Sequence, residues 1–166
     1  MKILVTGSAG FIGKNLVNFI KDNYDHEIFE FNSGENLKLL ETIIKKTDFI
    51  IHLAAVNRPK SKTLFREVNI NLSEYISSLL KDNSLETPII FTSSIQATLK
   101  NDYGLSKLKA EQIFSNLNKL NNNPVIIYRL PGVFGKWCKP NYNSVVSTFC
   151  YNSINNIDLK IDDPNK

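Results

Sequence analysis

The stretch VTGSAGFIG, residues 5–13, decides which fold the rest of the chain is expected to have. Glycine stands at every third position, at Gly7, Gly10 and Gly13, directly after a short apolar run and directly before a segment with helical periodicity. In such a place the first glycine allows a tight turn, the second lets the backbone approach a pyrophosphate, and the third lets the helix pack closely on the strand. A turn that is merely sterically convenient is the alternative. The position after a first strand favours a dinucleotide site.

The rest of the chain alternates short β-rich runs with longer segments of helical spacing. Strands are expected at 2–6, 27–31, 49–53, 88–93 and 125–130, with a weaker one at 157–161. Helices are expected near 11–22, 35–46, 66–82, 103–120 and 144–154. Because the strand runs are almost continuous in Ile, Val, Leu and Phe, they suit strands that helices cover on both faces. The pattern predicts an α/β fold with a doubly wound parallel sheet.

Length, charge and hydropathy limit the class of protein. With 166 residues, 42% of them hydrophobic, the chain can bury one core, and we expect one domain over 1–166. The net charge of +4 comes from lysines scattered among acids, which favours small anionic ligands and gives no sign of nucleic-acid binding. No apolar run is long enough for a signal peptide or a membrane span, so we expect a cytoplasmic protein with no membrane partner.

Cysteine and histidine give no sign of a metal site. Cys138 and Cys150 lack a metal-type spacing and are too few for a disulfide framework, which indicates free thiols in a reducing compartment. His26 and His52 each lie at or inside an expected strand without a metal-ligand partner at suitable spacing. We expect structural histidines and no metal ion.

A second constellation lies in FTSSIQATLKNDYGLSKLKAEQ, residues 91–112. Ser94 ends an expected strand, and Tyr103 and Lys107 are four residues apart, which places them on one face of a helix. A lysine ammonium beside a phenol lowers the pKa of that phenol, so that it can exchange a proton near neutral pH, and a serine hydroxyl can orient a carbonyl oxygen. Alone, the Tyr–Lys pair is an ordinary feature of a helix surface. Together with the glycine turn, it indicates acid–base chemistry on a carbonyl or an alcohol.

Several further motifs carry a family resemblance. They are GSAGFIG, HLAA at 52–55, Asn69 in VNINL, TSS at 92–94, YGLSK, and RLPGVFG at 129–135. Together they resemble the extended short-chain dehydrogenase/reductase family, which acts on nucleotide sugars and has a Rossmann-type fold. The stretches HLAAVNRP, SSIQAT and FGKWCKPNYNSV are similar to the branch of that family that reduces UDP-4-keto sugars in bacterial capsular polysaccharide synthesis.

The resemblance implies a role for each matching residue. Tyr103 would donate a proton, Lys107 would bind the nicotinamide ribose and tune Tyr103, and Ser94 would orient the substrate carbonyl. The cofactor would contact Gly7, Gly10, Phe11, Ile12, Gly13, Asn32, Leu53, Ala54, Ala55, Tyr103, Lys107 and Leu130. The UDP-sugar would contact Arg58, Ser94, Gln96, Asn141 and Asn143.

Some of these residues have an equally good structural interpretation. Arg58 could form an exposed ion pair instead of meeting a phosphate. Asn141 and Asn143 precede a helix expected to start near Val145, where polar residues are common caps. For Asn69 we favour a structural role, which could be support of the helix that carries Tyr103.

The chain departs from the family pattern in two places. Many relatives have a further strand that flanks the adenine, whereas here the expected helix 35–46 leads straight into the strand at 49–53, so we expect that strand to be absent. Relatives also continue beyond the point where IDLKIDDPNK, residues 157–166, ends this sequence. They add a substrate-closing region and, in the narrower branch, a cupin-like domain. We expect the chain to be the N-terminal part of a longer parent and to bind UDP-sugar weakly by itself.

The cofactor is predicted from the end of the second strand. NAD-preferring relatives have an acid there, which binds the ribose 2′-OH and repels a 2′-phosphate. Asn32 and Ser33 stand at that point and predict NADP(H), with NAD(H) as the alternative. The resemblance then implies an NADPH-dependent reductase of a UDP-4-keto-6-deoxy-amino sugar, homodimeric as the full-length parent. The alternatives are a nucleotide-sugar 4-epimerase or dehydratase, and a non-catalytic NAD(P)-sensing protein on the same fold.

Overall fold

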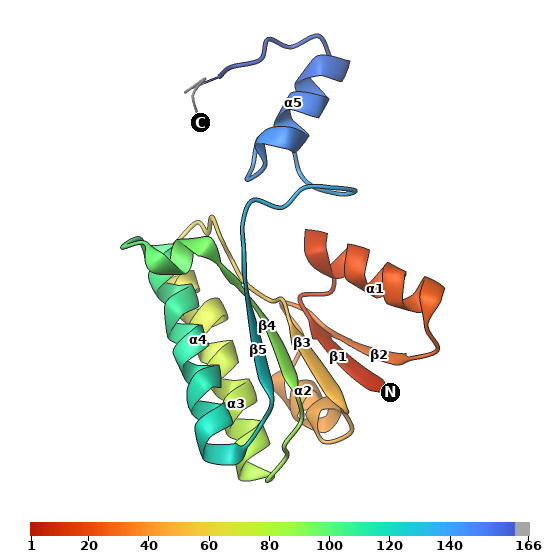
Figure 1. The fold of residues 1–166 in the computed structure, drawn as a ribbon, viewed down its shortest axis with the longest axis vertical. Helices are drawn as coiled ribbons and strands as arrows, with labels where there is room; N and C mark the ends of the chain where they lie inside the picture. Colours follow the sequence, from red (N-terminus) through yellow and green to blue (C-terminus); the bar gives the residue numbers. More distant parts are fainter. Residues whose placement is uncertain (162–166) are drawn as a thin grey trace. The chain divides into compact units, whose positions relative to one another are not determined.

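The computed structural model describes residues 1–161, which fall into two compact units that divide after Pro131. The first unit is built on five parallel strands in the order β2-β1-β3-β4-β5 (Figure 1). The strands are β1 (Lys2–Thr6), β2 (Glu27–Phe31), β3 (Phe49–His52), β4 (Ile89–Ser94) and β5 (Val125–Leu130). The five main strands predicted from the sequence are confirmed.

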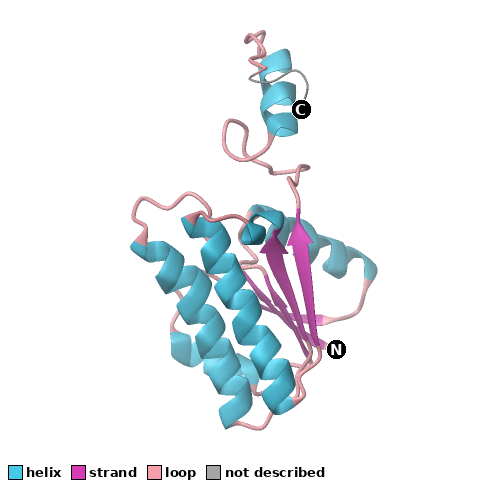
Figure 2. Cartoon of the chain, turned by 60° about the vertical axis from the view of Figure 1, so that its left-hand side comes forward, coloured by secondary structure: helices cyan, strands magenta, loops and turns pink. Residues whose placement is uncertain are grey.

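Helices cover both faces of this sheet, which confirms the doubly wound, Rossmann-type arrangement (Figure 1). One face carries α1 (Phe11–Asn23), and the other carries α2 (Leu37–Ile44), α3 (Leu72–Asp82) and α4 (Asp102–Asn121). The helices α3 and α4 lie side by side (Figure 2). A π-helix, η1 (Phe65–Asn71), leads directly into α3, and a 3-10 helix, η2 (Ile95–Thr98), follows β4. The sequence predicted a single helix over 66–82 and did not reveal its π-helical first part.

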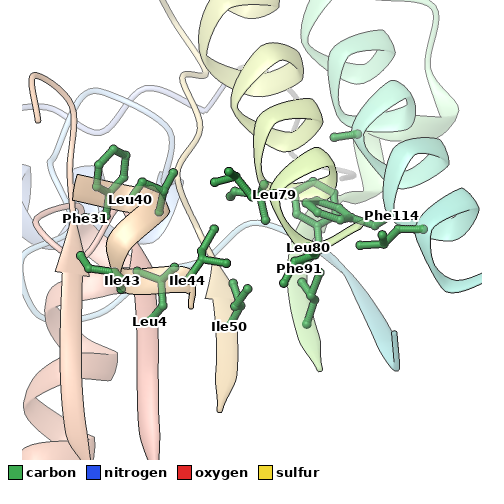
Figure 3. Packing of buried hydrophobic residues seen from close by; sticks show 14 residues of the cluster. Leu4, Phe31, Leu40, Ile43, Ile44, Ile50, Leu79, Leu80, Phe91 and Phe114 are labelled. Carbon is green, nitrogen blue, oxygen red and sulfur yellow. The ribbon is translucent and has the colours of Figure 1, made fainter. Parts of the chain in front are cut away.

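The core consists of two apolar clusters, because successive side chains of a strand point to opposite faces of the sheet. Leu4 enters the larger cluster, beneath α2, α3 and α4, whereas Ile3 and Val5 enter the smaller one, beneath α1. In the larger cluster the ring centroids of Phe91 and Phe114 lie 5.2 Å apart (Figure 3). Packing on both faces fixes where the carboxyl ends of the strands lie.

The strand order of the sheet changes direction at β1, because β2 pairs with one edge of β1 and β3 pairs with the other. On one side of β1 lies β2, an edge strand, and on the other lie β3, β4 and β5. No further strand is inserted between α2, which ends at residue 44, and β3, which begins at residue 49, as the sequence predicted. In open parallel sheets, ligands bind at the carboxyl ends of the strands near such a reversal. The fold therefore places a candidate site at the ends of β1, β3 and β4.

The second unit, described from 132 to 161, contains the predicted helix α5 (Val145–Ile154). Ser144 caps it by accepting a hydrogen bond from the Ser147 N–H at 3.2 Å, so the polar cap expected there is confirmed. The weak strand predicted at 157–161 is wrong, because these residues have no regular structure. A strand requires a neighbouring strand, and the described part of this unit provides none. Between residues 1 and 161, no helix is both long and apolar enough to cross a membrane.

Candidate active site

The glycine turn after β1 requires glycine for packing at two of its three positions. Gly7 has a φ of +71°, and a Cβ there would lie 2.8 Å from the backbone of Ala54, in the loop after β3. A Cβ on Gly13 would lie 2.3 Å from the Gly7 carbonyl oxygen. At Gly10 a Cβ would meet only that same oxygen, at 3.1 Å. Packing therefore constrains Gly10 least, as expected where a ligand approaches the backbone.

The N-terminus of α1 is open to an anion. Side chains cap α2, α4 and α5, but α1 begins after Gly10 with no side-chain cap. The first N–H groups of a helix, here those of Phe11 and Ile12, have no partner within the helix, and the helix dipole is positive at this end. The turn therefore fits the pyrophosphate of a dinucleotide.

Asn32, at the end of β2, is tied to this turn and to an acid that the sequence analysis missed. Its side-chain oxygen accepts a hydrogen bond from the Ala9 N–H at 2.8 Å, and its amide donates to Ser8 Oγ at 2.9 Å. The carboxylate of Glu35 accepts a hydrogen bond from the Asn32 N–H. A turn over 32–35, in which Gly34 has a φ of +91°, brings Glu35 back to the strand end. The only sequence feature that indicates this turn is the pair Ser33 and Gly34, which directly precedes Glu35.

The residues predicted to be catalytic come from β4 and α4. Ser94 ends β4, and its hydroxyl accepts a hydrogen bond from the Gln96 N–H at 3.2 Å. Tyr103 is the second residue of α4, is half-buried, and has its ring centroid 6.2 Å from that of Phe65 in η1. Lys107 lies one helical turn later on the same face.

Lys107 is a buried cation, only 2% exposed. Its Nζ lies 4.4 Å from the centroid of the Phe91 ring. Burial lowers the pKa of Lys107 from 10.5 to about 7, against the opposing attraction of Glu111. A lysine that gains or loses its charge near neutral pH is suited to adjusting the pKa of a neighbouring phenol.

A tight junction fixes α4 against the end of β4. A Cβ on Gly104 would lie 2.0 Å from the Gln96 carbonyl oxygen, so η2 and α4 meet through their backbones. Asn101 caps α4 by accepting a hydrogen bond from the Gly104 N–H at 2.7 Å, and its amide donates to Gln96 Oε1 at 3.3 Å. Ser94 directly precedes η2 and Tyr103 directly precedes Gly104, so the junction lies between these two residues along the chain. Gln96 was predicted to contact substrate, but its side-chain oxygen accepts this hydrogen bond from Asn101.

A chain of hydrogen bonds behind the site was not apparent in the sequence. The Ala54 N–H donates to Thr6 Oγ1 at 3.2 Å, and Thr6 Oγ1 lies 2.7 Å from His52 Nδ1. His52 Nε2 lies 3.1 Å from Ser73 Oγ, which donates to the Asn69 carbonyl at 2.9 Å. Because the Ser73 proton is directed at that carbonyl, His52 donates from Nε2 and accepts at Nδ1.

Asn69 connects this series of hydrogen bonds to α4, the helix that carries Tyr103. Its side chain bonds both the N–H and the carbonyl of Val56, at 2.8 and 3.0 Å, and donates to Ser106 Oγ at 2.9 Å. Ser106 donates in turn to the Tyr103 carbonyl at 2.7 Å. These bonds agree with the structural role expected for Asn69. The π-helical turn that places it is of a kind frequent at functional sites.

Four other residues predicted to bind the cofactor border the same edge of the sheet. Leu53, Ala54 and Ala55 directly follow β3. Leu130 ends β5 and is paired with Ser94 in the parallel register.

The other predicted substrate contacts belong to two further segments. Arg58 is exposed in the loop after β3. Asn141 and Asn143 belong to the second unit, where Asn141 has a φ of +54° and its N–H donates to Thr148 Oγ1 at 2.9 Å. The substrate role of these three residues stays a prediction.

The structure describes the surroundings of His52 and of both cysteines. His52 is bonded at both ring nitrogens, and its pKa falls to about 3, first because of burial and then because of the charge of Lys107. Cys138 and Cys150 are free thiols. Over the residues that the structure describes, no group of three His, Cys, Asp or Glu side chains could hold a metal ion.

A doubly wound parallel sheet with a glycine turn at its reversal point defines a dinucleotide-binding protein of the Rossmann type. The model of the "NAD dependent epimerase/dehydratase family" matches residues 3–162, and the chain belongs to this family. The family resemblance inferred from the motifs is thereby confirmed.

Several relatives are similar over nearly the whole chain. A UDP-2-acetamido-2,6-beta-L-arabino-hexul-4-ose reductase of Pseudomonas aeruginosa is 43% identical over 161 residues, which are 97% of this chain and 43% of the relative. A UDP-glucose 4-epimerase of Vibrio cholerae is 30% identical over 182 residues, covering 87% of this chain and 55% of the relative. The crystal structure of the capsular polysaccharide assembling protein CapF from Staphylococcus aureus matches with a TM-score of 0.84 and 44% identity. That match covers 98% of this chain and 44% of CapF, so the chain spans less than half the length of the reductase and of CapF.

Proposed function

We propose that the full-length protein reduces the C4 ketone of a UDP-linked 6-deoxy-amino sugar to an alcohol. The observation that carries this proposal is the Ser94, Tyr103 and Lys107 set, which lies at the same sheet edge as the glycine turn. The 43% identity to a reductase of a UDP-linked hexul-4-ose supports the choice of substrate. A reduced nicotinamide dinucleotide, when bound, supplies the hydride for C4.

The chain's own residues would hold the ketone and supply the proton. Ser94 Oγ already accepts a hydrogen bond from the Gln96 N–H, so its proton is available to the ketone oxygen. Tyr103 would give its hydroxyl proton to that oxygen as negative charge develops there. Lys107, when charged, would stabilise the phenolate that remains. Hydride and proton together convert the C=O group to CH–OH.

We infer NADPH as the reductant. Neither Asn32 nor Ser33 carries the negative charge that repels a 2′-phosphate, and the Asn32 side chain is engaged with Ser8 and Ala9. Glu35 opposes this choice, because its carboxylate lies at the Asn32 N–H. Glu35 is exposed, so it is able to turn away when a phosphate approaches.

The residues after Ser94 favour reduction over dehydration. A sugar 4,6-dehydratase needs an acid and a base to remove water across C5 and C6, and those enzymes carry an Asp–Glu pair directly after the catalytic hydroxyl residue. Ile95 and Gln96 occupy these positions and exchange no protons. Loss of either the acid or the base lowers the rate of such a step by about 10²- to 10⁴-fold. A 4-epimerase is the second candidate, because it uses the same three residues and a UDP-glucose 4-epimerase is 30% identical.

For the cellular setting, we infer a cytoplasmic homodimer that serves capsular or surface polysaccharide synthesis without contacting membrane or nucleic acid. The likeness to CapF supports the pathway. Sedimentation of the full-length protein tests the dimer.

The experiment for the activity uses the full-length protein, a UDP-4-keto-6-deoxy-amino sugar and NADPH, with nicotinamide absorbance as the readout. We expect absorbance to fall only when both sugar and enzyme are present. Tyr103→Phe should retain NADPH binding but slow the reaction by about 10²-fold or more. A wild-type protein that binds NADPH and sugar without oxidising NADPH would contradict the proposal and point to a sensing protein.

A further inference from the structure

Glu111 is a buried carboxylate that the proposed reaction does not use. Its side chain is 8% exposed and accepts three hydrogen bonds. Ser93 Oγ donates at 2.5 Å, and the Arg129 guanidinium donates from Nε at 2.9 Å and from Nη2 at 2.7 Å. A carboxylate held in this two-pronged way stays ionised, and these bonds hold the pKa of Glu111 below its usual value although burial alone would raise it.

The partners of Glu111 come from each element that carries the site. Glu111 lies four residues after Lys107, so the two share a face of α4 with Tyr103. Ser93 directly precedes Ser94 in β4 and is paired in the sheet with Arg129 of β5. One carboxylate therefore joins the helix and both strands.

The charge of Lys107 interacts electrostatically with two titratable groups, Glu111 and His52. On β4 the ammonium meets the Phe91 ring, and on β3 the interacting group is His52, which is neutral near pH 7. On its own helix it faces Tyr103 one turn before and Glu111 one turn after. The β5 strand contributes Arg129, whose charge is directed at Glu111.

We propose that Glu111 is a positioning residue whose negative charge keeps Lys107 protonated beside Tyr103, and that Arg129 limits this effect by partly neutralising Glu111. This inference rests on the proposed role of Lys107 in the reduction. A purely structural Glu111 would only hold α4 on the sheet, and its charge would be irrelevant.

Two substitutions separate these roles. Glu111→Gln and Arg129→Gln both break the ion pair between α4 and β5. The bond from Ser93 stays in Arg129→Gln, and the Gln amide oxygen can still accept it in Glu111→Gln. The two substitutions change the charge near Lys107 in opposite directions, because one removes a negative and the other a positive group. The proposal therefore expects the pKa of Lys107 to fall in Glu111→Gln and to rise in Arg129→Gln. Ser93→Ala, which removes only a neutral donor, is the matched control.

The measurement is an NMR titration of the full-length protein labelled with ¹³C at the lysine ε-carbons, with Lys107 assigned by its loss in Lys107→Met. This readout needs no substrate. The alkaline limb of the NADPH-oxidation profile is the second readout, and it should move by roughly one pH unit to lower pH in Glu111→Gln. Arg129 is 43% exposed at its side chain, so Arg129→Gln tests the idea even where Glu111→Gln does not fold.

Opposite shifts of the Lys107 titration support the proposal. Shifts in the same direction, or none in Arg129→Gln, overturn it and leave Glu111 a structural residue. If the titration shifts as expected while no UDP-4-keto sugar is reduced, the proposed function fails and the charge coupling stands.

Discussion

At the scale of single residues, Lys107 carries a positive charge at a buried position, where the fold would be more stable with a neutral side chain. Lys107 has a pKa of about 7 in the folded chain because it is buried, against 10.5 when unfolded. Between these values the unfolded chain binds more protons, so this group makes stability rise with pH from about 7 to 10.5 and lowers stability below that window. Function and stability are therefore opposed at Lys107.

Lys107→Met tests this opposition. We expect the free energy of unfolding to rise by up to about 5 kcal/mol at pH 6, because the two pKa values differ by about 3.5 and each pKa unit corresponds to about 1.4 kcal/mol. The gain should shrink toward pH 10. Denaturant unfolding at both pH values measures it. Lys109→Met, at an exposed position on the same helix, is the control. An equal effect of Lys107→Met at both pH values would contradict the account.

His52 acts in the same direction as Lys107, in a lower pH window. Its folded pKa of about 3 lies below the unfolded value of 6.5, so the unfolded chain binds more protons between the two and stability falls as the pH drops through that range. We expect His52→Gln to reduce this slope by up to about 1.4 kcal/mol per pH unit. His26→Gln is the control, because His26 is only half-buried and stacks on Tyr24. Unchanged acid sensitivity in His52→Gln would show that the buried ring does not set it.

Substitution of Glu35 tests whether the protein prefers NADPH or NADH. The Glu35 carboxylate accepts a hydrogen bond from the Asn32 N–H at the end of β2, where an acid repels a 2′-phosphate and binds a ribose 2′-OH. Glu35→Gln should therefore tighten NADPH binding severalfold and should not tighten NADH binding. Fluorescence titration of the full-length protein with both dinucleotides measures this. Tighter binding of NADH than of NADPH by the wild-type protein would contradict the inferred preference.

Sequence reasoning identified the residues whose spacing carries the signal. Gly7 and Gly13 follow a strand at fixed intervals, and Tyr103 and Lys107 share a helix face, so local patterns were enough. Glu35 was missed because a turn folds it back onto the strand end. The partners of Glu111 and His52 were missed because strand register and helix packing bring them together, and neither is visible in local sequence.

At the scale of elements, the junction between η2 and α4 is the most demanding contact. A Cβ on Gly104 would lie 2.0 Å from a backbone oxygen, so Gly104→Ala must move the start of α4 and with it Tyr103. We expect a loss of about 2 kcal/mol or more in unfolding free energy, together with a fall in activity. Gly132→Ala, where a Cβ meets nothing within 4 Å, is the matched control. Wild-type stability and turnover in Gly104→Ala would mean that the junction is loose.

The elements were predictable where the sequence pattern and the tertiary environment agree. The strands β1, β3 and β4 have nearly continuous apolar runs and contribute to both apolar clusters, so composition was a sufficient guide there. The strand β5 contributes only to the larger cluster, and Ile126 and Tyr128 on its other face are exposed. The weak run at 157–161 alternates like a strand, but its Ile157 N–H bonds the Asn152 carbonyl at 2.9 Å instead of a neighbouring strand. The π-helical start at 65–71 carries Asn69, whose side chain bonds Val56 and Ser106, and periodicity does not reveal such contacts with distant residues.

At the scale of the whole molecule, the parallel sheet brings the glycine turn and the residues proposed for acid–base chemistry to one edge. Gly7 follows β1, Ala54 follows β3 and Ser94 ends β4, so three neighbouring strands deliver the parts of one site. The hydrogen-bond chain through His52 and Asn69 then links the cofactor side to the catalytic helix. This arrangement suits both the proposed reductase and the alternative epimerase, which differ in the fate of the hydride.

The stoichiometry of NADPH oxidation therefore tests the central claim most directly. The full-length protein is incubated with a UDP-4-keto-6-deoxy-amino sugar and excess NADPH, and oxidised cofactor is counted against sugar product. The account predicts one NADPH oxidised for each sugar reduced, with both quantities falling together in Tyr103→Phe. Conversion of a UDP-sugar without net oxidation of NADPH, abolished by the same substitution, would contradict the reductase assignment and establish the epimerase in its place.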